Sequence, residues 1–230
     1  MMFFKKISLC ILSVVISYAA QSICISIPAQ SNTVTKVFTG SPSQKIFHFE
    51  VSLAAPVVKN DVSCFLPVTK EWQQDICTKL KFDFSNPCVQ GEICKPLNIP
   101  SKTINIKGDG NCFFTALSLW ITGSDKYKHA LRSTLVGFMR NSERISLMMD
   151  PKQELNEYLD TMAIDGQYAN FYELYAAAEM LKTSIYVYSR EEWQFISKDG
   201  VGGQEMVDGC LYMLHINNNH FEVVVDVEDK

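Results

Sequence analysis

The chain has 230 residues, of which 47% are hydrophobic and 20% are charged, and its formal net charge is −4 at pH 7. This length allows one large domain or two small ones, and the composition is that of a globular protein rather than a disordered one. The mildly acidic balance argues against a nucleic-acid-binding protein, which would need clustered Lys and Arg to neutralise phosphates.

The first residues are typical of a targeting segment. Lys5 and Lys6 precede an apolar run from Ile7 to Ala20, and the small residues Ser17 and Ala19 suit a cleavage site before Ala20. The run is shorter than the roughly 18–20 apolar residues of a membrane-spanning helix. We therefore expect residues 1–19 to be a signal peptide of a secreted or secretory-pathway protein, with no stable membrane span after cleavage. An uncleaved anchor or a buried helix is the alternative.

The cysteine count fits an oxidising compartment with one thiol left over. Of eight cysteines, Cys10 lies in the signal and seven remain in the mature chain. An odd number in a secreted chain indicates a free thiol, and crowding within residues 64–94 predicts a local disulfide cluster. The members of that cluster are Cys64, Cys77, Cys88 and Cys94. A zinc site is disfavoured, because no Cys-x-x-Cys pair and no nearby His accompany them.

Residues 20–100 form a predicted N-terminal extension whose role the sequence leaves open. A Ser-, Thr- and Pro-rich stretch comes first, alternating apolar residues at 46–51 predict a strand, and residues 70–80 allow a short helix. The extension is partly strand, with disulfide links expected among its cysteines. A pro-segment, a substrate-binding extension and a structural cap are the three alternatives for its role.

Residues 101–230 form the predicted catalytic domain. Helical periodicity is present at 113–121, 127–139 and 171–181, with one or two further helices within 143–162. Apolar and β-branched runs predict strands at 183–188, 193–196, 211–216 and 221–227, the last two joined by a turn of three asparagines. Helices precede strands, which indicates an α+β fold or an α/β sandwich.

Cys112 follows a glycine-containing turn, Gly108 to Asn111, and begins a predicted helix. Unpaired N–H groups and the helix dipole at such a position favour the thiolate, which is the nucleophilic form of cysteine. Glycines at 108 and 110 permit close approach of a substrate, and N–H groups of the turn can hold an oxyanion. A buried structural cysteine or half of a disulfide is the alternative, and helix-start position alone favours it.

A cysteine nucleophile needs a base, which is usually histidine. Of four histidines, His220 begins a strand beside a loop, where catalytic groups are commonly placed. The others are His48 in an early strand region, His129 on a helix face, where a surface or packing role is expected, and His215 within an apolar strand, where a satisfied core role is the commoner one. Glu222 shares a strand face with His220, and Asp109 lies three residues before Cys112, so either acid can orient the imidazole.

Several segments together resemble the OTU (ovarian tumour) family of cysteine proteases. The first is Lys107-Gly-Asp-Gly-Asn-Cys-Phe-Phe114, which is similar to the nucleophile motif of that family. The later ones follow in the family's order, at Leu131-Arg132, at Glu173 to Ala178, at Ile185 to Tyr188 and at Asn219-His220-Phe221. The resemblance covers about residues 104–227.

This resemblance implies a papain-like OTU fold, with a small β-sheet packed between helices, and a thiol-dependent deubiquitinase. Such an enzyme hydrolyses the bond after the C-terminal glycine of ubiquitin or a ubiquitin-like modifier, and neither a metal nor an organic cofactor is implied. By this resemblance Cys112 is the nucleophile and His220 the general base. Asp109 is the acid of the motif, and Glu222 is a possible acid that orients His220. The oxyanion loop consists of Gly108, Gly110 and Asn111.

Two features depart from the family pattern and keep other functions in view. Residues 165–170 contain no Trp where the family often has an aromatic element, which favours a different substrate groove. A secretion signal contrasts with the intracellular location of ubiquitin, unless the protein is an effector delivered to another cell. The alternatives are a catalytically silent binding module, a secreted protease of another substrate, and a disulfide-stapled structural protein in which Cys112 is paired.

Overall fold

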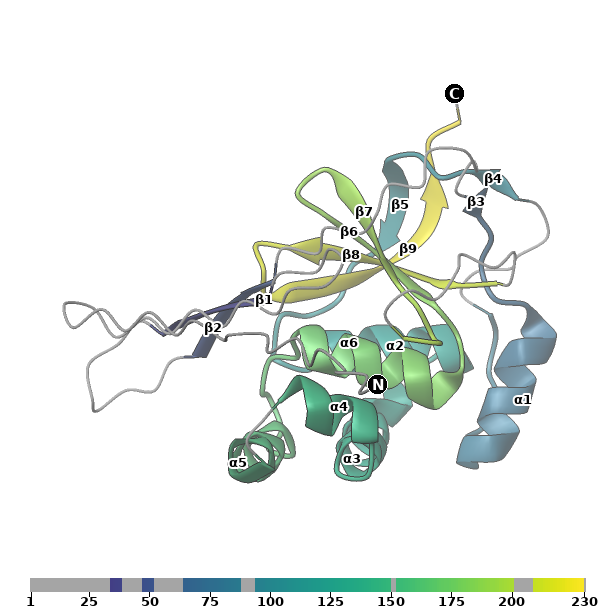
Figure 1. Cartoon of the computed structure of the whole chain (residues 1–230). Helices are drawn as coiled ribbons and strands as arrows, with labels where there is room; N and C mark the ends of the chain where they lie inside the picture. The colour runs from purple at the N-terminus through teal and green to yellow at the C-terminus, as the bar shows by residue number, and fades with distance from the viewer. Residues whose placement is uncertain are drawn as a thin grey trace, which may run out of the picture. The chain divides into compact units, whose positions relative to one another are not determined.

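The computed structural model in Figure 1 describes residues 34–38, 47–51, 64–87, 94–149, 152–200 and 209–229. The predicted signal peptide and Cys88 lie outside these residues. The chain divides into two units, Met1–Lys59 and Asn60–Lys230. In the first, β1 (Val34–Phe38) pairs antiparallel with β2 (Phe47–Val51), as the alternation at 46–51 predicts for β2. Among the described helices, none has the length and apolar character needed to cross a membrane.

The second unit is built on a mixed five-stranded sheet. Its strand order is β5-β9-β8-β6-β7, and only the β6–β8 pair is parallel. The strands are β5 (Pro100–Ile104), β6 (Ile185–Ser189), β7 (Glu192–Ile196), β8 (Leu211–Ile216) and β9 (His220–Val227). The four strands predicted after residue 182 are therefore confirmed, whereas β5 carries too weak an alternation to be recognised from the sequence.

The β8–β9 hairpin sets the position of His220. Asn217 and Asn218 have φ angles of 50° and 59°, in the left-handed region that asparagine tolerates better than most residues. The tight turn pairs Ile216 with His220, which makes His220 the first residue of β9. Because strand side chains alternate, Glu222 lies on the same face as His220.

Helices pack against the sheet in two layers. In Figure 1, α2 (Cys112–Thr122) and α6 (Phe171–Leu181) lie next to the sheet, and the three helices that come between them in the chain lie beyond them. Those three are α3 (Lys128–Met139), α4 (Glu143–Met148) and α5 (Lys152–Met162), with the 3-10 turn η1 (Asp125–Tyr127) before α3. The predicted helices are confirmed, with two within 143–162, and the α+β class is confirmed with them.

Helix α2 is the centre of the core. Ten of its eleven residues are buried, since it lies between the sheet on one side and α1 and α3 on the other. Phe113, Leu117 and Trp120 are completely buried, and the Phe113 ring packs edge-on against Phe221 of β9 with centroids 5.3 Å apart. A helix that is apolar on all sides belongs inside a domain. Cys112, at its first position, is thereby fixed relative to the sheet.

The described residues of segment 64–100 belong to the same compact unit as residues 101–230. The segment comprises β3 (Cys64–Phe65), α1 (Lys70–Leu80) and β4 (Lys95–Pro96), with β3 and β4 antiparallel. Gln73 Nε2 of α1 donates a hydrogen bond of 2.8 Å to the Trp120 carbonyl of α2. Helix α1, confirmed over its predicted range, therefore covers the C-terminal half of α2.

The disulfide cluster expected in this segment is only partly present. Cys64 and Cys94 form a disulfide that joins the start of β3 to the residue before β4. Cys77, by contrast, is a buried free thiol whose Sγ lies 3.3 Å from the Ile121 carbonyl oxygen, so its expected pairing is wrong. Cys77 lies on the buried side of α1 together with Ile76, next to α2.

The Cys64–Cys94 bond closes a loop with a sequence separation of 30 that contains all of α1. A cross-link of this span restricts the unfolded chain, so Cys64→Ser/Cys94→Ser should lower the free energy of unfolding by roughly 2–4 kcal/mol. Urea denaturation followed by circular dichroism measures the change. Dithiothreitol should shift the wild-type midpoint to that of the variant and leave the variant unmoved, whereas equal midpoints without reductant would contradict the prediction.

Candidate active site

Cys112 is a free, buried thiol beside the β8–β9 turn. Its side chain is 1% exposed, and its Sγ lies 3.7 Å from the carbonyl oxygen of Asn219, the residue before His220. The start of α2 and the start of β9 therefore meet at one place, as the sequence hypothesis requires. Among the described residues Cys112 has no disulfide partner, so the structure gives no support to its being half of a disulfide.

The imidazole of His220 points its Nδ1 toward the turn that carries Cys112. A methyl group placed on Gly108 would lie 3.6 Å from His220 Nδ1. That nitrogen is buried and has no hydrogen-bond partner among the described residues. A buried ring nitrogen without a partner is unusual, and this one lies beside the Gly108–Asn111 turn that precedes Cys112. Catalytic hydrogen bonds are often long in proteins without substrate and tighten when substrate binds.

Glu222 lies on the other side of the same ring. Its Oε1 is 3.8 Å from His220 Nε2, and its Oε2 accepts a 2.7 Å hydrogen bond from Thr103 Oγ1 of β5. The distance to the ring exceeds that of a hydrogen bond but is short enough for a carboxylate to stabilise an imidazolium. Thr103 was not recognised from the sequence, because only the pairing of β5 with β9 brings it to the site.

The carboxylate of Asp109 makes a hydrogen bond within its own turn. Its Oδ1 accepts a 2.9 Å hydrogen bond from the backbone N–H of Asn111, two residues on. This is the local bond by which Asp stabilises tight turns. Of the two acids left open by the sequence, Glu222 is therefore the one whose carboxylate lies near the ring, and Asp109 shapes the backbone before Cys112.

Gly110 is required by a close contact between two backbone segments. Its φ is +78°, and a Cβ at this position would lie 1.7 Å from the carbonyl oxygen of Gly166. Gly166 itself has a φ of +81° and lies in the connection between α5 and α6. The Gly108–Asn111 turn therefore rests directly on that connection, with no side chain between them.

Arg132 of α3 is buried beside this contact, with 2% of its surface exposed. Its guanidinium donates to the Gly110 carbonyl, to Asn111 Oδ1 and to carbonyls of the α5–α6 connection, and it lies over the Phe114 ring. Burial lowers the pKa of Arg132, and the charges of Asp165, Glu173, Cys112 and Asp109 oppose that shift. In the sequence this residue stood out only through the family resemblance.

A buried acid fixes the far end of the α5–α6 connection. Glu173 closes a capping box at the start of α6, where its Oε2 accepts a 2.8 Å bond from the Asn170 N–H. The Tyr158 hydroxyl of α5 donates to the same carboxylate. Burial raises the pKa of Glu173 to about 7, while these hydrogen bonds act in the opposite direction. The connection that touches the Cys112 turn is thus held at both ends.

Of the other histidines, the structure describes the side chains of His215 and His129. His215 stacks on Phe221 with ring centroids 4.3 Å apart, and burial lowers its pKa to about 4, so it is neutral at physiological pH. His215 is half-buried, and its Nε2 has no hydrogen-bond partner among the described residues, so its assignment as a satisfied core histidine stays a prediction. His129 is exposed, with its Nδ1 2.9 Å from Asp165 Oδ1. The side chain of His48 lies outside the described part of the chain.

Within the described part of the chain, no three His, Cys, Asp or Glu side chains are grouped so that they could hold a metal ion.

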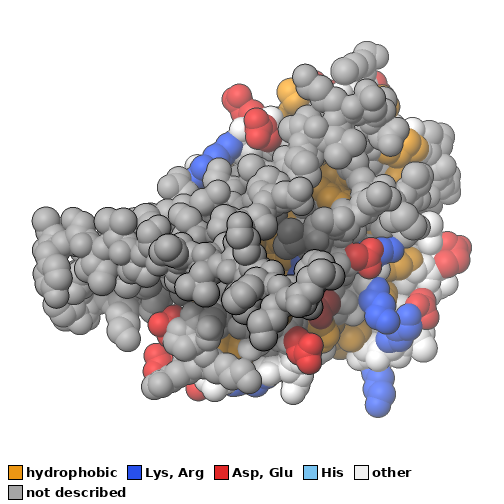
Figure 2. Space-filling model, viewed as in Figure 1, with side chains coloured by type: hydrophobic (Ala, Val, Ile, Leu, Met, Phe, Trp, Pro, Cys, Tyr) orange, Lys and Arg blue, Asp and Glu red, His pale blue; other side chains and the backbone are white. Residues whose placement is uncertain are grey.

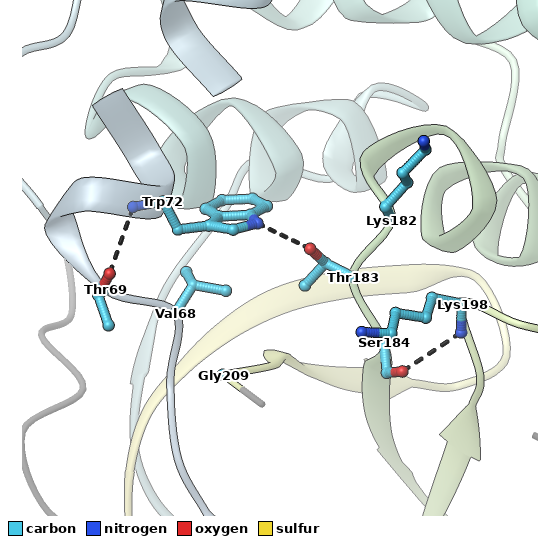
Figure 3. Close-up of a pocket in the computed structure, with 8 residues that line it drawn as sticks. All are labelled: Val68, Thr69, Trp72, Lys182, Thr183, Ser184, Lys198 and Gly209. Atoms are coloured by element: carbon cyan, nitrogen blue, oxygen red, sulfur yellow. Dashed lines mark hydrogen bonds between the residues drawn. The ribbon is translucent and has the colours of Figure 1, made fainter. Parts of the chain in front are cut away.

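A cavity of about 260 Å³ is lined by α1, the loop after α6 and Gly209, and none of its residues belongs to the Cys112 site (Figure 3). Trp72 Nε1 donates to Thr183 Oγ1 across it. On the face shown in Figure 2, the acidic and basic side chains of the described residues are interspersed.

The Gly110 contact predicts the effect of adding one methyl group. Gly110→Ala places a Cβ against the Gly166 carbonyl at a positive φ, so the variant should lose more than about 2 kcal/mol of unfolding free energy. Gly137→Ala is the matched control, because a Cβ on Gly137 of α3 would meet no neighbouring atom within 4 Å, and it should gain about 0.5–1 kcal/mol. Thermal denaturation compares them, and equal effects would contradict the contact.

Comparison with known proteins agrees with this geometry. The family model described as OTU-like cysteine protease matches residues 107–221, which is half of the chain and includes both Cys112 and His220. The ovarian tumor domain-containing deubiquitinating enzyme 7 of Arabidopsis thaliana is 28% identical over 88 residues, which are 38% of this chain. The matched part spans only 24% of that relative.

Solved structures of OTU domains are also similar to the chain. The OTU domain of OTUD1 is 22% identical, with a TM-score of 0.47, over 54% of this chain and 85% of that one. The Hazara virus OTU bound to ubiquitin is 19% identical, with a TM-score of 0.41, over 53% of this chain and 79% of the other. On the match of residues 107–221, the chain belongs to the family of OTU-like cysteine proteases.

Proposed function

We propose that this protein is a deubiquitinase, a cysteine protease that hydrolyses the isopeptide or peptide bond after the C-terminal glycine of ubiquitin or a ubiquitin-like modifier. The observation that carries the proposal is that the free Cys112 thiol and the buried Nδ1 of His220, which has no hydrogen-bond partner among the described residues, both lie next to the Gly108–Asn111 turn. Membership of the OTU-like family and the deubiquitinating relative from Arabidopsis thaliana support the substrate class.

The first half-reaction forms a thioester. His220 Nδ1 takes the proton of Cys112, and the thiolate attacks the carbonyl carbon of the modifier's last glycine. The oxyanion that develops is held by backbone N–H groups of the turn and of Cys112, as preorganised donors do in acyl transfer. When the tetrahedral intermediate collapses, the C–N bond breaks and His220 returns its proton to the leaving amine. The products are a free amine and an acyl-enzyme.

The second half-reaction restores the enzyme. His220 takes a proton from water, the hydroxide formed attacks the thioester carbonyl, and the C–S bond breaks. The modifier leaves with a free carboxylate, and Cys112 regains its proton. Glu222 stabilises the imidazolium present in both halves, because its carboxylate lies 3.8 Å from Nε2, and Thr103 holds that carboxylate in place. No step needs a metal or an organic cofactor.

We also propose that the protein is secreted or enters the secretory pathway. Two features support this: the basic and apolar N-terminal segment, and the Cys64–Cys94 disulfide, a bond that persists in oxidising compartments. A deubiquitinase with such a signal would meet ubiquitin if it is delivered into the cytosol of another cell. The stapled segment 64–94 then contributes stability during that passage.

The experiment that tests the function is labelling of the purified protein, lacking residues 1–19, with ubiquitin that carries a thiol-reactive group at its C-terminus. The wild type should gain the mass of one ubiquitin, Cys112→Ala should gain none, and His220→Ala should react at least about 10²-fold more slowly. Cys77→Ala is the matched control, since Cys77 is also a buried free thiol but lies on α1, and it should react like the wild type.

Each failure of that labelling has a distinct meaning. A folded protein with a free Cys112 that does not react with ubiquitin would contradict the modifier as substrate while leaving a cysteine protease of another substrate. A Cys112 found in a disulfide would contradict the enzyme itself. Labelling that persists in Cys112→Ala would assign the nucleophile to another cysteine.

The geometry also predicts that substitutions of Glu222 and Asp109 slow ubiquitin labelling by different factors. Glu222→Ala removes the charge beside His220 Nε2 and should slow labelling by roughly 10–10²-fold. Asp109→Asn keeps an Oδ1 that can accept from the Asn111 N–H, so its loss should be several-fold smaller. The same ubiquitin label measures both rates. The reverse order would make Asp109 the acid that orients the imidazole.

A further inference from the structure

Arg132 makes hydrogen bonds to the two segments that meet behind Cys112. On the turn side, Nη2 donates to the Gly110 carbonyl and to Asn111 Oδ1, both at 2.8 Å, and Nε donates to the same Oδ1 at 3.3 Å. Toward the end of α5 and the α5–α6 connection, Nη1 donates to the Met162 carbonyl at 3.0 Å, and Nη2 lies 2.8 Å from the Gln167 carbonyl, so the two N–H groups of Nη2 are shared among three acceptors. One guanidinium thus joins both segments.

These five hydrogen bonds all go to uncharged oxygens, although the side chain is only 2% exposed. Burying a cation is costly unless its N–H groups are satisfied, so the acceptors must stay in place for the arginine to be accommodated. The planar fork of guanidinium can bind acceptors on several sides at once, which a lysine ammonium cannot do with the same geometry. The arrangement therefore penalises any movement of either segment.

The restraint acts on the peptide units directly before Cys112. The Gly110 carbonyl is fixed by Arg132, and the N–H of the same peptide unit, on Asn111, is fixed by Asp109. The Asn111 side chain is held by Arg132, and its Oδ1 lies 3.4 Å from the Gly166 backbone nitrogen. With these groups fixed, the orientation of the Cys112 N–H and sulfur has little freedom left, which is the preorganisation that an oxyanion site needs.

We propose that Arg132 is a positioning residue, which locks the Gly108–Asn111 turn to the α5–α6 connection and so sets the reactive geometry of Cys112. The inference rests on the proposed function for the reaction that this geometry serves. Since Arg132 is too deeply buried to touch a bound modifier, it acts on the rate of bond making and breaking and leaves the affinity for the modifier largely unchanged.

Steady-state cleavage of a C-terminal amide of ubiquitin tests this, with Arg132→Met and Arg132→Lys beside the wild type. Arg132→Met should lower kcat by roughly 10²-fold and change KM by less than about three-fold, because a small misplacement of reacting groups costs that much in rate. Arg132→Lys keeps a donor and a charge and should recover part of kcat. An unchanged kcat, or a loss confined to KM, would overturn the proposal.

A second measurement does not depend on ubiquitin. Amide hydrogen exchange followed by mass spectrometry should show faster exchange in Arg132→Met at both residues 108–112 and 163–168, with the β8–β9 strands unchanged. If the wild type proves inactive on ubiquitin, the proposed function fails while this exchange result still decides the coupling. Exchange that rises at one segment alone, or at neither, would overturn the coupling.

Asn111→Ala keeps the proposal testable if Arg132→Met does not fold. It removes the acceptor shared by Nε and Nη2, so kcat should fall by at least about 10-fold at similar KM. If Arg132 acts through the turn, the kcat of the Asn111→Ala/Arg132→Lys double variant should be lowered by less than the product of the two factors by which the single variants lower kcat. Independent, fully multiplicative losses would count against it.

Discussion

The position of Cys112 depends on a contact between two backbone segments that leaves no space for a side chain. Gly110 lies against the Gly166 carbonyl, both residues adopt positive φ, and Arg132 spans the two segments with hydrogen bonds to carbonyl and amide oxygens. Glycine supplies the close approach, and the buried cation makes separation costly, because moving either segment away would remove several of the acceptors that satisfy the guanidinium. This contact and the Arg132 hydrogen bonds fix the backbone that directly precedes Cys112.

The opposite side of the site is built by the sheet. The asparagine turn between β8 and β9 starts β9 at His220, and β5 brings Thr103 to Glu222. The imidazole is thereby placed between a carboxylate at Nε2 and the nucleophile turn at Nδ1. The buried helix α2 links the two sides, because Phe113 packs on Phe221 next to the residues that react. Strand β9 therefore carries His220, and helix α2 carries Cys112.

Local patterns in the sequence were enough to predict most of the fold, whereas the assignment of Cys112 and His220 as nucleophile and base rests on the resemblance to the OTU family. Helical periodicity located α2, α3 and α6, and alternation located the later strands. The helix-start position of Cys112 alone favoured a structural role. What local patterns could not reveal depends on tertiary pairing. Thr103 reaches Glu222 only across the β5–β9 ladder, and Arg132 meets Gly110 only when α3 packs on α2. The sequence also left open whether Glu222 or Asp109 orients His220, because the distance of each carboxylate from the ring depends on tertiary packing.

The position of the proton on the His220 ring is the property that tests the proposed mechanism most directly, because that mechanism requires Nδ1 to face Cys112 and Nε2 to face Glu222. Imidazole nitrogen-15 shifts of the free protein, assigned with a His220→Gln variant, report which nitrogen is protonated. We predict a proton on Nε2, with Nδ1 either bare or sharing the Cys112 proton. A neutral ring protonated on Nδ1 alone would contradict the account, since no base would then face the thiol.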